Sequence, residues 1–330
     1  MKVKILDLYI IKKFLGTFLF AIGLIVCIAV VFDISEKVDD FIERHAPLKA
    51  IAFDYYLNFI PYFANLFSPL FVFISVIFFT SKMAGQTEII AILNSGISFN
   101  RFLRPYIISA TVIAIASFYL NNWVIPHANL VRLQFENIYI KNPYVYRGRN
   151  IHRQIKPGEF VYFESYDNKA NTGFMFSLEK FEEGKLVTKL MADRITWDSL
   201  TQKWSIENYT IRHINGMTEE LKKGIRLDTA LSIHPSEFNR RMNFIEAMDF
   251  SELNTYIKEE KQRGSEVIPF YEVEKYRRTS YPFATFILTL IGVAISSKKV
   301  RGGVGLQLGA GILLSFTYIM FMQVSTKAPK

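Results

Sequence analysis

The chain has 330 residues, of which 50% are hydrophobic and 15% aromatic, and its formal net charge is +9. Basic proteins often bind nucleic acid, but this sequence has no arginine-rich arm and no recognisable recognition helix, so no nucleic-acid partner is expected. The hydrophobic residues lie in long uncharged runs with the charges between them, which indicates a membrane protein. The single cysteine, Cys27, excludes an intramolecular disulfide.

Five uncharged runs reach the length of about 20 residues that is needed to cross the hydrocarbon core of a bilayer. They are Phe14–Phe32, Tyr55–Ser81, Pro105–Val131, Thr279–Ser297 and Gly302–Thr326. The first run is longer than the apolar region of a signal peptide and has no small-residue cleavage site behind it, so we expect a retained anchor. The second contains prolines together with Asn58 and Asn65, which predicts a kinked helix whose polar stripe faces protein or a cavity.

The short loops predict how the spans are oriented. Basic residues collect on one side, at Lys2, Lys4, Lys12, Lys13, Lys82, Arg101, Arg104, Lys298, Lys299 and Arg301. On the other side, the loop Asp33–Asp54 carries three basic and six acidic residues. The positive-inside rule then places the amino terminus in the cytoplasm and the segment between Arg132 and Arg278 outside.

That outer segment has the pattern of an all-β domain. Short stretches rich in β-branched and aromatic residues are separated by turn signals such as Pro157-Gly158 and Asn215-Gly216. This spacing predicts a sandwich or jelly-roll-like domain. In one of these stretches the apolar residues lie at even-numbered positions up to Ile206 and change to odd-numbered positions at Tyr209. Two readings remain: a bulge, or a domain that is apolar on both faces. The expected fold class is an α-helical polytopic membrane protein with an inserted all-β, jelly-roll-like periplasmic domain.

We therefore predict three regions. Residues 1–131 form spans one to three, residues 132–265 the β domain, and residues 266–330 spans four and five. Catalytic motifs are missing from all three. The sequence has no G-x-x-x-x-G-K-[ST] loop, no H-E-x-x-H or paired Cys/His spacing and no G-x-S-x-G turn, so we expect neither an enzyme nor a metal or other cofactor.

The loop between spans two and three, residues 85–96, is predicted to contain a short helix bounded by glycines. An apolar stripe of Ile89, Ile92 and Leu93 follows Glu88, an acid placed where the helix dipole favours it. One reading is an interfacial helix lying on lipid headgroups. The other is a coupling helix that docks into a groove on a cytoplasmic partner.

Two further features suggest contacts within the membrane. Gly305 and Gly309 form a G-x-x-x-G pair that permits close helix packing, either within the chain or against a partner. Beyond the first span, Lys37 and Arg44 lie seven residues apart and hence on one helical face. They are candidates for binding lipid phosphate groups. The alternative is a solvated amphipathic extension, because acidic residues outnumber basic ones there.

Several segments resemble the LptF/LptG permeases of the lipopolysaccharide export transporter. They are Leu6–Phe14, Ser68-Pro69, Thr87–Ser98, Asn122–Pro126, Tyr281-Pro282 and the stretch R-G-G-V-G-L-Q-L-G-A-G at residues 301–311. The order of three spans, a β-rich outer domain and further spans is also similar, so the resemblance covers nearly the whole chain. The E-x-x-x-x-x-x-S-G element from Glu88 to Gly96 is its most specific part.

The resemblance implies a non-enzymatic ABC transporter permease subunit of the bacterial inner membrane. It implies four partners: a cytoplasmic ATPase docked on Glu88, Ile89, Ile92 and Leu93, a second permease subunit, a periplasmic bridge protein of jelly-roll domains, and lipopolysaccharide. The family usually has a sixth span, which we do not recognise before Lys330. In this family the first helix also tends to be lysine-rich at its outer end, whereas the present sequence has mainly acidic residues there. The competing hypotheses are a membrane-anchored sensor or scaffold with a ligand-binding β domain, and a lipid-modifying enzyme.

Overall fold

The computed structural model describes residues 4–140, 148–238, 242–265, 267–298 and 303–327. The chain forms two compact units. The helical unit comprises Met1–Ile140, Glu246–Leu253 and Pro269–Lys330, and the β unit comprises Lys141–Ile245 and Asn254–Ile268. The predicted fold class, a polytopic helical protein with an inserted all-β domain, is confirmed.

The helical unit contains the predicted spans. Its elements are α1 (Ile5–Glu43), α2 (Leu48–Ala50), η1 (Ile51–Tyr56), α3 (Leu57–Gly85), α4 (Glu88–Asn94), α5 (Phe99–Tyr119), η2 (Leu120–Val124), α6 (Ile125–Tyr139), α8 (Ile268–Ser280), η5 (Tyr281–Phe283), α9 (Ala284–Ser296) and α10 (Gly303–Lys327). Within the described residues, five helical stretches are long and apolar enough to cross a membrane, as the sequence predicted. Two more elements, η4 (Met242–Ala247) and α7 (Phe250–Gln262), each contain residues of both units.

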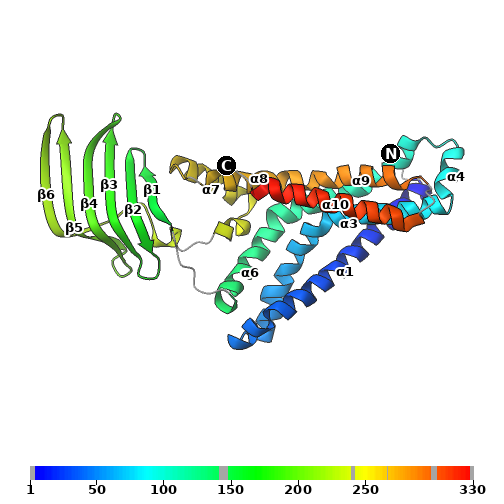
Figure 1. Ribbon diagram of the computed structural model, residues 1–330, viewed down its shortest axis with the longest axis horizontal. Helices are drawn as coiled ribbons and strands as arrows, with labels where there is room; N and C mark the ends of the chain where they lie inside the picture. Colours follow the sequence, from blue (N-terminus) through cyan, green and yellow to red (C-terminus); the bar gives the residue numbers. More distant parts are fainter. Residues whose placement is uncertain (1–3, 141–147, 239–241, 266, 299–302, 328–330) are drawn as a thin grey trace. The chain divides into compact units, whose positions relative to one another are not determined.

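Helix α3 is the centre of the helical unit, where it packs on α1, α6, α9 and α10 (Figure 1). Its apolar side joins a core formed by several helices around Ile10, Phe14, Val76, Phe102, Tyr106 and Val293. Burying such side chains gives no hydrophobic gain inside a bilayer, so close packing and hydrogen bonds must hold the helices together. One such bond joins Thr80 of α3 to the hydroxyl of Tyr106 on α5, at 2.9 Å.

Two glycines bring the helices close at this centre. A Cβ atom added to Gly292 of α9 would lie 2.9 Å from Cγ1 of Val76, and one added to Gly311 of α10 would lie 2.3 Å from Cδ1 of Ile77. Any larger residue would require the facing side chains of α3 to shift. Small residues at the contacts with α3 therefore set the spacing of α9 and α10.

Spans two and three both include a stretch of π-helix, η1 and η2, followed within one or two turns by Pro61 and Pro126 respectively. Proline cannot donate a hydrogen bond to the preceding turn and its ring crowds that turn, so a wider turn accommodates it. In η1 the carbonyl groups of Phe53 and Asp54 accept hydrogen bonds from the side-chain amide of Asn58, at 2.9 and 3.0 Å.

The β unit is built on one antiparallel sheet. Its strands are β1 (Arg149–Lys156), β2 (Glu159–Asp167), β3 (Thr172–Glu182), β4 (Lys185–Asp198), β5 (Lys203–Asn215) and β6 (Thr218–Thr229). They lie side by side in sequence order, each paired with the next (Figure 1). One face of the sheet is covered by the following segment, which includes η3 (Pro235–Glu237). From it, Phe238 stacks on Tyr166, and the carbonyl of Ile233 accepts a hydrogen bond from the buried indole of Trp204 at 2.9 Å.

A crease crosses four neighbouring strands of this sheet. Ser165, Phe174, Arg194 and Glu207 stand in register on β2 to β5. Beside this row, Met175 and Asn208 have left-handed backbone conformations, with φ values of 50° and 51°. Side chains on one face of a strand normally recur at every second residue. At this row the interval becomes three residues, from Ala192 to Ile195 on β4 and from Ile206 to Tyr209 on β5. All four side chains nevertheless pack in or against one core. The parity change seen in the sequence therefore marks a local irregularity, and the apolar face remains the same on both sides of it.

Candidate functional site

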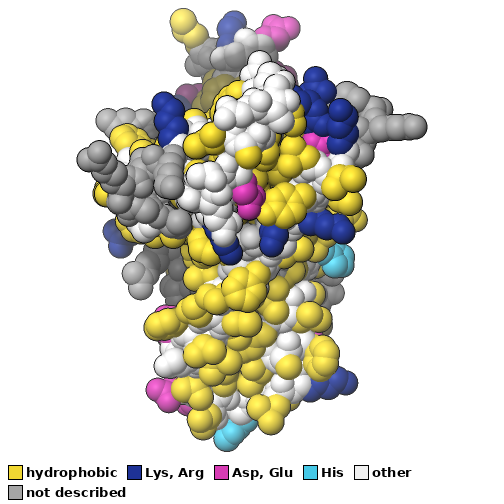
Figure 2. Space-filling view, turned by 90° about the vertical axis from the view of Figure 1, so that its right-hand side faces the viewer, with side chains coloured by type: hydrophobic (Ala, Val, Ile, Leu, Met, Phe, Trp, Pro, Cys, Tyr) yellow, Lys and Arg dark blue, Asp and Glu magenta, His cyan; other side chains and the backbone are white. Residues whose placement is uncertain are grey.

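The basic end of the helical unit is the end where α1 and α5 begin and α3 and α9 finish. It carries Lys4, Lys12, Lys13, Lys82, Arg101, Arg104 and Lys298 among the described residues. Figure 2 faces this end and shows lysine and arginine side chains around it, with hydrophobic side chains covering the lower part of the view. Helix α4 lies at the same end (Figure 1).

Helix α4 is held against the helical core by its apolar stripe. Ile89 is only 2% exposed and belongs to the core that contains Ile10 and Phe102, while Ile92 and Leu93 are half-buried against the same core. The helix is bounded by left-handed residues, Thr87 with φ 60° and Gly96 with φ 85°. These tight turns let a seven-residue helix lie between two long ones.

The other side of α4 faces outward. Ile90 is 50% exposed, and Ala91 and Asn94 are exposed beside it. Glu88 is half-buried at the first turn of the helix. The outward surface of α4 therefore has an apolar centre and an acidic edge.

An ion pair joins the beginnings of α1 and α5. The guanidinium group of Arg101 donates to both carboxylate oxygens of Asp7, at 2.6 and 2.7 Å. The same carboxylate accepts a hydrogen bond at 2.9 Å from the backbone nitrogen of Lys4. Asp7 is 5% exposed. A two-pronged contact of this kind fixes the orientation of both partners as well as their distance.

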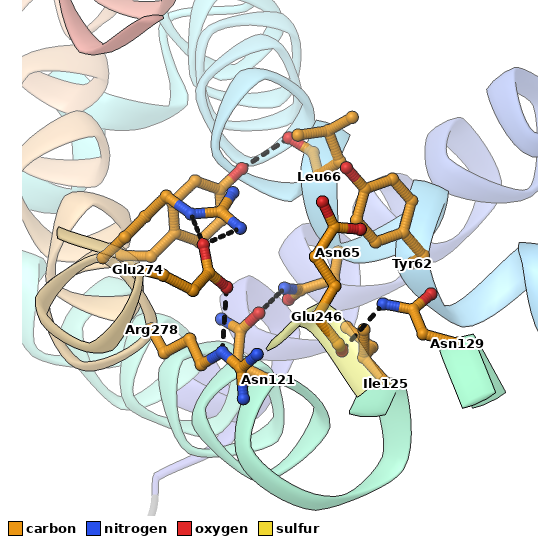
Figure 3. Close-up of a pocket in the computed structure, with 11 residues that line it drawn as sticks. Tyr62, Asn65, Leu66, Asn121, Ile125, Asn129, Glu246, Glu274 and Arg278 are labelled. Atoms are coloured by element: carbon orange, nitrogen blue, oxygen red, sulfur yellow. Dashed lines mark hydrogen bonds and ion pairs between the residues drawn. The ribbon is translucent and has the colours of Figure 1, made fainter. Parts of the chain in front are cut away.

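A polar chamber lies at the opposite end of the helical unit, between α3, η2, α6, η4 and α8 (Figure 3). Arg277 and Arg278 each donate to the Glu274 carboxylate at 2.9 Å. Arg278 also donates to the backbone carbonyl of Met248 at 2.6 Å, and the side-chain amide of Asn129 donates to the backbone carbonyl of Glu246 at 3.1 Å. These bonds fasten residues 246–248, where the chain re-enters the helical unit, to α6 and α8.

The chamber contains a cavity of about 30 Å³. Two buried atoms that line it, Oδ1 of Asn129 and Nδ2 of Asn121, have no hydrogen-bond partner among the described residues. The side chain of Glu246 extends toward Tyr62 (Figure 3). Burial raises the pKa of Glu246 above its ordinary value of 4.5, and the neighbouring Glu274 carboxylate raises that pKa further. The arrangement is a polar junction between α3, α6, η4 and α8.

Lys37 lies in an aromatic setting beyond the first span. Its ammonium group is 2.5 Å from the Asp33 carboxylate, 4.9 Å from the centre of the Tyr55 ring, and hydrogen-bonded to the Tyr55 hydroxyl. Tyr56 also donates to Asp33, at 3.1 Å. Arg44 stands at the end of α1, where its backbone nitrogen donates to Asp40.

The glycine pair of α10 faces away from the rest of the chain. A Cβ atom added at Gly305 or Gly309 would meet nothing within 4 Å among the described residues. Gly309 instead lines a shallow apolar groove along the outer side of α10, together with Ile312, Leu313, Phe316, Thr317, Met320, Phe321 and Val324. The exposed large side chains on this groove would be costly in water and suit either lipid or a second helix.

A family model described as lipopolysaccharide export system permease LptF/LptG matches residues 8–328. The chain belongs to this family. No curated protein matches it. As an LptF/LptG permease it is a component of a lipopolysaccharide transport system and a multi-pass protein of the inner membrane, as the sequence resemblance predicted.

The permease brings some of the predicted site residues together. Ile89, Ile92 and Leu93 pack on one core, with Glu88 at their helix start. Sequence reasoning did not find the Asp7–Arg101 pair or the chamber around Glu246 and Glu274. Arg101 was counted only as a topology signal, and the one indication of the chamber was Asn65, which lines it and donates to Asn121 at 2.8 Å.

Proposed function

We propose that this permease is a transmembrane subunit of an ABC-type transporter that extracts lipopolysaccharide from the inner membrane and passes it to a periplasmic bridge. The observation that carries the proposal is the family match over residues 8–328. The basic end, which includes α4, would face the cytoplasm by the positive-inside rule, and the β unit would lie in the periplasm. The chain itself would hydrolyse no ATP.

The docking site for the ATPase would be the outward side of α4. An apolar centre at Ile90 with an acidic edge at Glu88 fits a groove on a soluble partner. Ile89, Ile92 and Leu93 would contribute by anchoring α4 to the other helices, because Ile89 is fully covered within the chain. Closure of the ATPases would push α4 and thereby move the helices that it contacts.

The lipid would meet the outer part of α1 and the groove on α10. Lys37 and Arg44 are the cations proposed to bind its phosphate groups. Lys37 would do so by exchanging Asp33 for a phosphate, since both are anions that pair with an ammonium group. The groove around Gly309 would face the second permease subunit or the acyl chains between the two subunits.

The bridge protein would add to the β unit at an open strand edge. The outer edge of β1 is partly occupied within the unit, because the backbone nitrogen of Gln154 donates a hydrogen bond to the carbonyl of Arg263 at 3.1 Å. Among the described strands, β6 pairs only with β5 and leaves its other edge open. Its many charged side chains disfavour indiscriminate pairing, which suits an edge reserved for one partner.

The decisive experiment is to co-express the permease with the ATPase and second permease of its own transport system and to substitute Glu88→Arg. We expect the variant to insert into the membrane at the wild-type level but to lose the co-purified ATPase and lipopolysaccharide export. Glu88→Gln, which keeps the size of the side chain, separates loss of charge from charge reversal. Glu183→Arg, at an exposed acid in the turn between β3 and β4, is the matched control.

Wild-type ATPase recovery and export in Glu88→Arg would contradict the docking assignment. A wild-type chain that recruits no ATPase at all, and whose β unit binds a ligand without any lipid transport, would instead support the sensor or scaffold hypothesis.

A further inference from the structure

Helix α1 is attached to the other helices unevenly along its length. In its first turns Asp7, Ile10 and Phe14 are covered, at 5%, 0% and 0% exposure. Farther along, Phe20 and Phe32 are exposed by 73% and 72%. The helix is therefore clamped near its start at the basic end and packed again at its far end, where Phe41 is 6% exposed against Tyr55 and Phe135, while large side chains between the two ends are exposed.

The clamp attaches α1 to both sides of the α4–α5 corner. Asp7 holds Arg101 at the start of α5, and three residues later Ile10 packs in one core with Ile89 of α4. Only residues 95–98 separate α4 from α5. The last of these, Ser98, caps α5 by accepting a hydrogen bond from the backbone nitrogen of Arg101 at 3.3 Å. A displacement of α4 therefore reaches Arg101 through a very short connection.

We propose that the Asp7–Arg101 ion pair is a positioning contact that transmits displacement of α4 to α1, so that α1 moves as a lever when the ATPase acts. The inference rests on the proposed docking function of α4. Apolar contacts such as those of Ile10 and Phe14 resist separation but tolerate sliding and rotation. A bidentate pair of charged groups resists both, because both hydrogen bonds depend on direction.

The experiment uses the assembled transporter and the natural label site Cys27. This residue is the only cysteine of the chain, is exposed, and lies on α1 beyond the clamp. A fluorophore on Cys27, in a complex with cysteine-free partner subunits, reports movement of α1 when a non-hydrolysable ATP analogue is added. Lipopolysaccharide released per ATP hydrolysed is the second readout, and co-purified ATPase is the third.

Four chains are compared: wild type, Asp7→Arg, Arg101→Asp, and the double swap. We expect each single reversal to retain the ATPase, to lose the Cys27 response, and to release about tenfold less lipid per ATP, the size of a typical coupling between two sites. The swap should recover the response and bring the lipid yield to within about threefold of wild type. Reversal of the exposed pair Arg194–Glu207, joined at 2.9 Å on the β unit, is the matched control and should change neither readout.

A purely structural pair would lower the melting temperature while leaving the Cys27 response and the lipid yield per ATP of the surviving complex intact, and that result overturns the proposal. A swap that behaves like the single reversals overturns it as well. If the reversals prevent assembly, Asp7→Asn and Arg101→Lys replace them, and an unchanged Cys27 response in both would decide against the lever. A wild-type complex without bound ATPase would refute the proposed function itself, before any variant is compared.

Discussion

Ser81 of α3 donates a hydrogen bond to the side-chain carbonyl of Gln307 on α10, which follows it by 226 residues. The amide nitrogen of Gln307 donates in turn to the carbonyl groups of Ile295 and Lys298, at 3.2 and 2.9 Å, where α9 ends. One side chain that is 5% exposed therefore joins three helices and satisfies two carbonyl groups that the end of α9 leaves without partners.

We predict that Gln307→Leu destabilises the helical unit, because leucine keeps much of the volume but leaves those groups unbonded. The expected loss is about 1–3 kcal/mol, the usual effect of leaving buried polar groups unsatisfied. Thermal unfolding of the purified permease in detergent measures it. Gln134→Leu, at an exposed position of α6, should leave the melting temperature unchanged, and an equal effect at both sites would argue against the role of Gln307.

The glycines of α10 should respond to substitution in two different ways. Gly311→Leu places a side chain where Ile77 already lies, so we expect about 1–3 kcal/mol of destabilisation from overpacking. Gly309→Leu meets open space within the chain, so the melting temperature of the isolated permease should hold while its association with the second permease subunit weakens. Unfolding measurements and co-purification test the two effects separately. A Gly309→Leu chain that assembles normally would remove the case for a partner contact there.

The Glu246 carboxylate should make stability depend on pH. Its pKa in the folded chain lies above the ordinary value of 4.5 because of burial and the Glu274 carboxylate, so the folded state binds a proton more tightly than the unfolded state does. The stability that this group contributes is fully present below pH 4.5 and is lost as the pH rises through the raised value. Glu246→Gln, which stays neutral, should therefore raise the melting temperature at neutral pH and leave it unchanged below pH 4.5.

Melting curves from pH 4 to pH 8 measure this difference, with Glu43→Gln as the control at an exposed acid. A stabilisation that is the same at every pH would mean that the benefit of glutamine does not come from proton binding at this site.

The crease of the β unit requires a left-handed residue at Asn208. We expect Asn208→Gly to be nearly neutral and Asn208→Val to cost about 1–3 kcal/mol, because a β-branched side chain is strained at a positive φ. The chain has three tryptophans, of which Trp197 and Trp204 lie in the β unit. In a Trp123→Phe background, tryptophan fluorescence during denaturation reports that unit alone. Equal stability of the valine and glycine variants would show that the strand accommodates valine by another conformation.

Local patterns predicted the elements well. The uncharged runs predicted the spans because crossing a bilayer requires length and apolarity, and both are visible in any window of the sequence. The parity change between Ile206 and Tyr209 was equally local, and it marked the crease although it left two readings open.

Contacts between distant segments could not be predicted in the same way. Asp7 and Arg101 are 94 residues apart, and nothing near either one indicates the other. The stripe of Ile89, Ile92 and Leu93 has the same spacing whether it faces a partner or the helices of its own chain. Likewise the G-x-x-x-G spacing singled out Gly305 and Gly309, while the glycine that packs inside the chain is Gly311.

The crease restricts how the β unit can vary in length. Since the inward-facing positions shift on both β4 and β5 at one shared row, deleting or inserting a residue within either strand would move part of its inward-facing side chains to the other face of the sheet. A matched change in the paired strand would be needed to keep the register. Related sequences should therefore differ in length at the hairpins between strands, and these hairpins are the places where a tag or a reporter peptide could be inserted.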